Sequence, residues 1–200
     1  NLVEEKGRIR MVLPKTTNYQ IRLVLREGDL LSELNKEVKH GEFDIAIMGS
    51  PRRKRMTNKI SQFLDTSIFF VKNFNPNWNY KILLCVDDSR ATKRAVILST
   101  RISKQFDAEI ISLTVSKTSF FGKGYRNAHT WAERYLKRVG IPFESKLLSG
   151  NPVDVFVDEA GEDHIIIMGK AKGNEILKFI FGSKPIHTAQ RSNCPVLMVN

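Results

Sequence analysis

The sequence predicts an α/β protein whose carboxyl-terminal part is a doubly wound, five-stranded parallel sheet. Strand-like apolar runs alternate with segments of helical period from residue 80 to the end. The runs at 82–86, 165–168 and 196–199 are apolar at successive positions. Such runs are typical of strands buried on both faces, as in a parallel sheet covered by helices on each side.

The elements of this part follow in alternation. Strands are expected at 80–86, 108–115, 143–148, 164–168 and 196–199, with helices at 89–106, 125–139, 152–160 and 184–191 between them. In the first helix Ala95, Leu98, Ile102 and Phe106 recur at helical spacing and form an apolar face. Together these elements predict consecutive βαβ units in one sheet.

A linker separates this part from the residues before it. Residues 73–79 carry four Asn and one Pro, which continue neither a helix nor a central strand. We therefore expect a complete module at 79–200, a linker at 73–78 and a shorter, partial module at 1–72.

The first 72 residues repeat part of the second module. Residues 41–49 and 161–169 share Gly, Glu, Ile, Ile, Met and Gly in register. A strand, a glycine and a helix precede each copy, at 21–26, Gly28 and 30–40 in the first, and a closing strand follows at 67–71. The first segment is thus expected to hold the last three strands of the module and one more at 8–13. Either the strands at 8–13 and 21–26 form a hairpin, or the first copy is cut down, because the connection between them is too short for a parallel crossover.

Composition narrows the class of protein. With 42% hydrophobic and 26% charged residues the chain is typical of a soluble globular protein, and no apolar run approaches the length of a membrane span. Cys85 and Cys194 have no metal-ligand spacing and are expected to be core thiols in a reducing compartment. The net charge of +11 favours anionic partners. We expect a cytoplasmic location.

The second module has a strand ending in Val86-Asp87, a run at 165–169 leading to Gly182-Ser183, and a closing run at 194–199. In these features it resembles the universal stress protein (UspA-like) family over its whole length. The resemblance implies an adenine nucleotide alpha hydrolase-like fold. In the ATP-binding branch of the family, phosphates bind a loop with the pattern Gly, two residues, Gly, nine residues, Gly, Ser or Thr, and the acid after the first strand approaches the adenosine.

The resemblance therefore implies a site for ATP, with magnesium, at the carboxyl ends of the strands. A glycine after a strand and a helix amino terminus both suit phosphate. Lys172 stands where the family has its second glycine, and Gly173 follows one position later, so we expect impaired binding. Met168 would pack on the adenine. The implied binding residues are Asp87, Met168, Gly169, Lys170, Lys172, Gly173, Gly182 and Ser183. The alternative for Asp87, Asp88 and Ser183 is helix capping, and for Met168 it is the core.

Other features suggest no catalysis. The four histidines lack metal spacing, and neither a GxSxG elbow nor a Walker loop is present, so we expect slow ATP hydrolysis at most. The basic run 52–55 is interpreted as a solvated loop, and nucleic-acid binding is not expected because no aromatic residues interleave with it. Residues 120–124 are expected to form a loop that covers the site or contacts a partner, and no phosphate loop is expected after Gly49.

Two functions remain open at this point. The first is a signalling or stress-response protein, which pairs its modules through their closing strands as a homodimer or an intramolecular pseudo-dimer. The alternative is a cytosolic regulatory or dimerisation domain of a membrane transporter with a degenerate nucleotide site. The opening Asn1, the short first copy, Lys172 and the positive charge favour this alternative, and membrane association would follow only from it.

Overall fold

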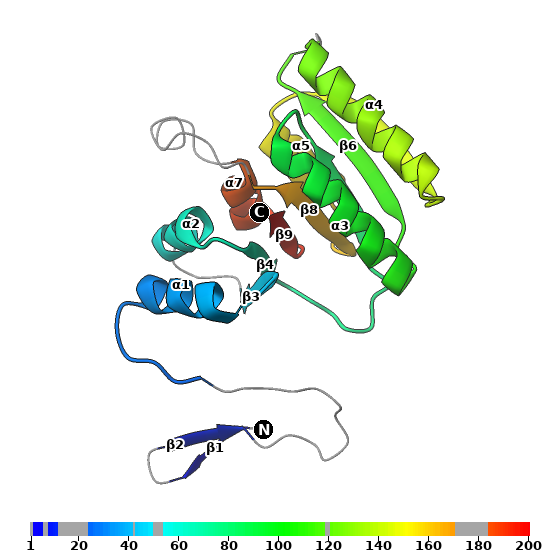
Figure 1. Ribbon diagram of the computed structural model, residues 1–200. Coiled ribbons are helices and arrows are strands. Elements are labelled where there is room, and N and C mark those ends of the chain that lie inside the picture. The colour runs from blue at the N-terminus through cyan, green and yellow to red at the C-terminus, as the bar shows by residue number, and fades with distance from the viewer. Residues whose placement is uncertain are drawn as a thin grey trace.

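The structure is a computed structural model that describes residues 2–5, 8–11, 24–41, 43–49, 54–118, 121–170 and 184–200 (Figure 1). Its main body is one seven-stranded sheet with the order β3-β4-β9-β8-β5-β6-β7. The strands are β3 (Ile45–Gly49), β4 (Ser67–Val71), β5 (Lys81–Val86), β6 (Ile110–Ser116), β7 (Phe143–Ser149), β8 (His164–Gly169) and β9 (Val196–Val199). Neighbours run parallel throughout, except that β4 and β9 are antiparallel.

The predicted doubly wound sheet is confirmed in the carboxyl-terminal part. From β5 the chain moves through β6 to β7 on one side, and then returns to β8 and β9 on the other. The topological switch point therefore lies between β5 and β8. The connecting helices are α3 (Arg90–Phe106), α4 (Lys123–Arg138), α5 (Pro152–Glu159) and α7 (Lys184–Arg191).

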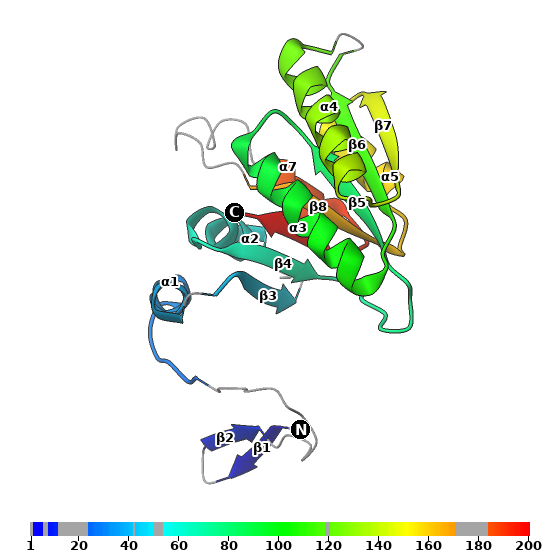
Figure 2. The same ribbon diagram turned by 45° about the vertical axis from the view of Figure 1, so that its right-hand side comes forward.

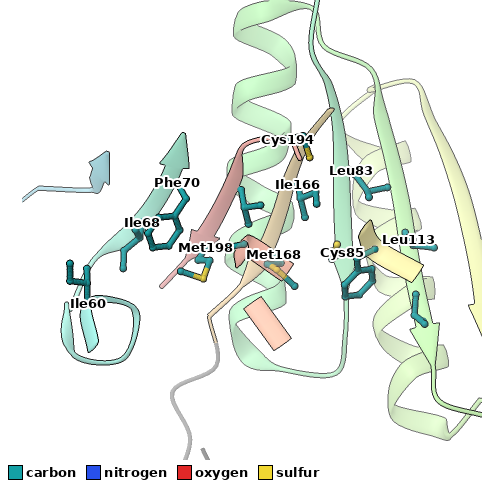
Figure 3. Packing of buried hydrophobic residues seen from close by; sticks show 14 of the residues in the cluster. Ile60, Ile68, Phe70, Leu83, Cys85, Leu113, Ile166, Met168, Cys194 and Met198 are labelled. Carbon is teal, nitrogen blue, oxygen red and sulfur yellow. The ribbon is translucent and has the colours of Figure 1, made fainter. Parts of the chain in front are cut away.

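The helices form a layer on each face of the sheet (Figure 2). On one face, Ala95 and Val96 of α3 and Leu136 of α4 pack with the sheet residues Ile82 and Ile167. On the other face, Phe156 of α5 and Ala189 of α7 pack with the residues that point the opposite way. Figure 3 labels ten members of that second cluster: Ile60, Ile68, Phe70, Leu83, Cys85, Leu113, Ile166, Met168, Cys194 and Met198. Burial on both faces explains the continuous apolar runs.

The amino-terminal segment joins the same sheet through its closing strand. It consists of α1 (Leu30–Gly41), β3, α2 (Lys54–Phe63) and β4, and β4 pairs with β9. The predicted contact between the two closing strands is thus observed. Leu34 of α1 and Ile60 of α2 pack into the cluster shown in Figure 3, so that the two segments share a core.

Three expectations for this segment are wrong. Lys54 and Arg55, expected in a loop, begin the helix α2, because Ile60 and Leu64 offer an apolar face that the sheet buries. Val24–Arg26 form no strand although 21–26 was expected to be one. The strand expected at 8–13 is β2 (Arg8–Met11), and in the described part of the chain its partner is β1 (Leu2–Glu5), in a separate antiparallel pair, rather than the segment 21–26 considered for the hairpin. A strand forms only where a neighbour satisfies its backbone groups.

Candidate functional site

A pocket of about 340 Å³ opens at the carboxyl end of β5, between the first turns of α3 and α4. Ligands of doubly wound sheets bind beyond the carboxyl ends of the strands near the switch point. β5 flanks that point, so the position of the pocket suits a ligand. Its lining residues are Asp87, Asp88, Ser89, Thr92, Lys93, Gly124, Asn127, Ala128 and Trp131.

Asp87 is held by the first turn of α3. Its Oδ1 accepts hydrogen bonds from the Ser89 amide at 3.0 Å and from the Thr92 hydroxyl at 2.5 Å. The Asp87 amide in turn donates to Thr92 Oγ1 at 3.2 Å. Thr92 itself is buried, with 2% of its surface exposed. Because both hydrogen bonds fall on Oδ1, they fix the orientation of the carboxylate, which lines the pocket.

Asp88 faces the amino terminus of α4. A Cβ added to Gly124 would lie 2.9 Å from Asp88 Oδ2, so the helix backbone approaches the carboxylate closely. Gly122, which caps α4, has no side chain for the free amides of that helix end. A carboxylate at this position is favoured by the helix dipole. Asp88 therefore helps to fix α4 against α3.

An aromatic wall closes the other side of the pocket. The Lys93 ammonium lies 5.5 Å from the centroid of the Trp131 ring, a cation–π distance. Trp131 also stacks on Tyr135, with 5.4 Å between the ring centroids. The pocket thus combines carboxylates, a hydroxyl, an ammonium group and an indole, the mixture of polar anchors and apolar wall typical of small-molecule sites.

Gly169 serves the packing of the sheet. A Cβ at this position would lie 2.7 Å from the Ala91 carbonyl carbon and from the Thr92 amide nitrogen. The first turn of α3 can therefore rest on the end of β8 only because residue 169 has no side chain. Through this contact Gly169 also sets the position of Thr92, and hence that of Asp87.

Met168 and Lys170 point away from the pocket. Met168 is 4% exposed and belongs to the cluster on the opposite face of the sheet (Figure 3). The Lys170 ammonium donates a hydrogen bond to the carbonyl oxygen of Leu64, just after α2, at 2.6 Å. The structure therefore brings Asp87 and Gly169 together, but not these two side chains with them.

The remaining predicted binding residues lie outside the described part of the chain: Lys172, Gly173, Gly182 and Ser183. So does Phe120 of the expected covering loop, whereas Gly122 caps α4 and residues 123 and 124 begin it. The described chain ends at Lys170 and resumes at α7, whose first residue is Lys184. Lys170 lies beside β9, since its amide donates a hydrogen bond to the carbonyl oxygen of Val199 at 2.6 Å.

Six lining residues were not predicted: Ser89, Thr92, Lys93, Asn127, Ala128 and Trp131. Apart from Ser89, at the amino end of α3, they stand on helix faces that read as amphipathic in the sequence, and nothing in their spacing marks a site. Only the packing of α3 beside α4 brings Lys93 and Trp131 together. The one available sequence signal was the rarity of tryptophan, since the chain has two.

The two cysteine thiols belong to the core. Cys85 and Cys194 are free and buried, as expected for core thiols, and burial raises the pKa of both, that of Cys85 well above the ordinary value. Among the described residues no group of His, Cys, Asp or Glu is arranged to hold a metal ion. None of the helices in the described ranges is long and apolar enough to cross a bilayer.

The fold and the pocket define a doubly wound α/β protein with a pocket at its switch point. Comparison with known proteins identifies the family. The model of the Universal stress protein family matches residues 79–200, and the chain belongs to this family. A universal stress protein of Methanocaldococcus jannaschii is 25% identical over 138 residues, covering 60% of this chain and 81% of the relative.

Solved structures agree with the fold. A universal stress protein from Archaeoglobus fulgidus superposes with a TM-score of 0.70 at 18% identity, over 85% of this chain and 64% of its own. This chain therefore spans less than two thirds of that structure. A universal stress protein in complex with cAMP gives a TM-score of 0.50 at 22% identity, over 60% of this chain and 97% of its own. The alternative of a transporter domain finds no support among these relatives.

Proposed function

We propose that this chain is a stress-type signalling protein that binds an adenine nucleotide at the Asp87 pocket. The observation that carries the proposal is the Asp87 carboxylate, which lines the pocket at the switch point and has one oxygen held by the first turn of α3. A carboxylate at the end of a strand suits the hydroxyl groups of a ribose. The cAMP held by a related structure supports an adenine nucleotide as the ligand class.

The two ends of such a ligand would meet different chemistry. The adenosine would lie in the pocket, with its apolar surface toward Trp131 and its hydroxyls toward Asp87. The phosphates would lie toward residues 169–184, where Lys172, Gly173, Gly182 and Ser183 supply an ammonium group, glycine amides and a hydroxyl before α7. Lys170 would contribute only if it left Leu64, and Met168 only if it left the core.

We further propose that the protein acts by binding rather than by catalysis, in the cytoplasm. Among the described lining residues Thr92 donates its hydroxyl to the Asp87 carboxylate, but Thr92 is buried, so its hydroxyl orients Asp87 rather than attacking a ligand. The β4–β9 pair supports an intramolecular pseudo-dimer of a partial and a complete module. Nucleotide occupancy would then be read by a partner through the surface around α3 and α4.

Isothermal titration with ATP, AMP and cAMP, with and without magnesium, tests this proposal. We expect saturable binding near one site per chain. Asp87→Asn keeps the shape but loses the charge, and should weaken binding roughly 10- to 100-fold, the range for a hydrogen bond to a charged group. Glu162→Gln, a carboxylate change at an exposed turn, is the matched control and should bind as the original chain does.

Two further measurements separate the ends of the site. Gly182→Val should weaken the binding of ATP more than that of adenosine, because the substitution acts on the phosphate end of the site. In a Trp78→Phe background the remaining fluorescence comes from Trp131 and should change on binding. No heat and no thermal shift with any of the three nucleotides at millimolar concentration would overturn the proposal.

A further inference from the structure

The helices α3 and α4 carry most of the net charge of the chain. They lie side by side on one face of the sheet (Figure 2). Together they hold ten Lys and Arg residues and one acidic residue, Glu133, a net charge of +9 with histidine neutral, against +11 for the whole chain. The helices of the opposite face, α1, α2, α5 and α7, hold seven basic and five acidic residues. The excess of positive charge is thus concentrated on one face.

The ten cations of this face are exposed to solvent. They are Arg90, Lys93, Arg94, Arg101 and Lys104 in α3, and Lys123, Arg126, Arg134, Lys137 and Arg138 in α4. None of them forms an ion pair with another residue that the structure describes. Many follow one another at a spacing of three or four residues, so that like charges are neighbours on the helix surface and destabilise it. A polyanion bound to this face would relieve the repulsion.

The first turns of both helices hold cations where an acidic residue would be favoured. Arg90 and Lys93 lie in the first turn of α3, Lys123 and Arg126 in that of α4, and neither turn has an acidic residue. The dipole and the free amides of a helix amino terminus favour anions. These side chains therefore add to the attraction of the helix ends for phosphate instead of opposing it, as acidic residues would.

Aromatic rings lie among the cations. Trp131 and Tyr135, one turn apart in α4, stack with 5.4 Å between the ring centroids and 22° between the ring planes. The Lys93 ammonium lies 5.5 Å from the centroid of Trp131, and the Arg138 guanidinium lies 5.4 Å from that of Tyr135. Both rings are half-buried and pack on the apolar cluster beneath the helices. The middle of the face is thus a short aromatic stack with a cation on each ring.

This combination favours single-stranded nucleic acid as the polyanion. Its bases stack on aromatic rings and guanidinium planes while Lys and Arg neutralise its phosphates. A membrane surface would meet the charge but not the half-buried rings. Within α3 and α4, both fully described, the one exposed large apolar side chain available for insertion is Phe106, the last residue of α3. The basic run 52–55, by contrast, has no aromatic residues within it.

We infer that the face formed by α3 and α4 is a binding surface for single-stranded nucleic acid. The strand would run along the two helices, with its phosphates on the exposed cations and its bases extending the stack of Trp131 and Tyr135. α3 has 17 residues and is about 25 Å long, which corresponds to about seven nucleotides of a stacked strand.

This surface goes beyond the nucleotide pocket proposed above. The two share Lys93 and Trp131. The cations in the carboxyl-terminal halves of the helices do not line the pocket: Arg101, Lys104, Arg134, Lys137 and Arg138. Substitutions among these five therefore test the surface without touching the pocket.

Fluorescence anisotropy of a labelled oligouridine of about 15 nucleotides, near the upper site size of single-strand binders, tests the inference. This probe has no adenine to enter the pocket. The chain should bind it with an association constant K that falls as salt rises. Five to ten phosphate contacts predict a slope of about −3.5 to −7 for log K against the logarithm of the salt concentration.

A double substitution in α4 measures the contribution of the cations. Arg134→Gln/Lys137→Gln should make the salt slope shallower by about 1.4 and weaken binding roughly two- to thirtyfold, the range for two exposed ion pairs. The matched control is Lys39→Gln/Lys59→Gln, which removes two exposed cations from α1 and α2 on the opposite face and should bind as the original chain does. The α4 variant should keep the affinity for AMP, so that the pocket and this surface can fail independently.

Tyr135→Leu separates stacking from the attraction of charge alone. Leucine keeps the apolar contact beneath the helix but has no ring, so the variant should weaken oligouridine binding at least about fivefold. It should leave the binding of inorganic polyphosphate, which has no bases, unchanged.

Four results would overturn the inference. The first is no binding of the oligouridine at low salt, and the second is polyphosphate binding of equal affinity with no effect of Tyr135→Leu on either ligand. The third is loss of oligouridine binding in Asp87→Asn but not in the α4 variant, because the strand would then enter the pocket. The fourth is sedimentation with vesicles of phosphatidylcholine and phosphatidylserine without oligouridine binding, which would assign the face to a membrane.

Discussion

The Lys170 ammonium donates a hydrogen bond of 2.6 Å to the carbonyl oxygen of Leu64 and so joins the end of β8 to the end of α2. Leu64 directly follows the last residue of that helix, where carbonyl groups lack partners within the helix and the dipole favours a cation. Lys170 thus connects the carboxyl-terminal part of the sheet to the amino-terminal segment, at a position where the sequence suggested a phosphate ligand.

Lys170→Met should reduce the stability of the fold and leave the affinity for the nucleotide unchanged. The lost charged hydrogen bond predicts a decrease of about 1–2 kcal/mol in the free energy of unfolding. Urea denaturation measures this loss, and Lys59→Met, at an exposed position of α2, controls for charge removal. A drop in ATP affinity without a loss of stability would assign Lys170 to the phosphates instead.

Gly169→Ala and Gly49→Ala form a matched pair with opposite outcomes. The first places a Cβ 2.7 Å from the backbone of α3 and should cost about 1–3 kcal/mol, as overpacking does. The second meets no atom and should leave the thermal midpoint of the chain nearly unchanged. Equal effects of the two substitutions would contradict the close contact between β8 and α3.

Thr92→Val should weaken nucleotide binding through its effect on the orientation of Asp87. Valine keeps the volume but removes the hydroxyl that orients Asp87 Oδ1, so Asp87 keeps only the Ser89 amide. About tenfold weaker binding is expected for the loss of one such hydrogen bond. Thr92→Ser restores the hydroxyl and should restore most of the affinity. If both variants bind ATP like the original chain, the hydrogen bond does not organise the site.

The two thiols predict a loss of stability at alkaline pH. Burial raises the pKa of Cys85 and Cys194 in the folded state, so only the unfolded chain releases their protons near pH 8.5, the ordinary thiol value. Their contribution is fully present below that pH and is lost as pH rises above it, by up to about 1.4 kcal/mol per pH unit for each thiol. Denaturation between pH 7 and 10 measures the slope, and Cys85→Val should reduce it. Rapid reaction of native protein with an aromatic disulfide at pH 7.5 would show that the thiols are accessible.

The apolar runs were sufficient to predict the strands of the sheet, because both faces of the sheet are buried. The strands from β5 to β9 lie where the sequence predicts them, within one or two residues at their ends. The helix α2 was missed because basic residues at 52–55 hid the spacing of Met56, Ile60 and Leu64. Residues 21–26 have the apolar pattern of a strand. Residues 24–26 nevertheless form none, because no neighbouring strand pairs with them in the described part of the chain.

Only some residues of the site could be predicted from the sequence. Asp87 could be found because it directly follows a strand, and the strand order then places it at the switch point. Trp131 and Lys93 could not, because their contact depends on how α4 packs beside α3. Met168 and Lys170 directly flank Gly169, yet their side chains leave the sheet on the other face, as alternate residues of a strand do.

The pairing of β4 with β9 also sets an order of events during protein synthesis. Phe69 leaves the ribosome long before its partner Leu197, which lies in β9, the strand of the sheet that is synthesised last. Until then β4 has an unpaired inner edge, and Ile68 and Phe70 lack the residues that later cover them. The nascent chain must therefore keep this strand from associating elsewhere, and a ribosome that stops before β9 would release a product in which both β4 and β8 lack the neighbour that β9 provides.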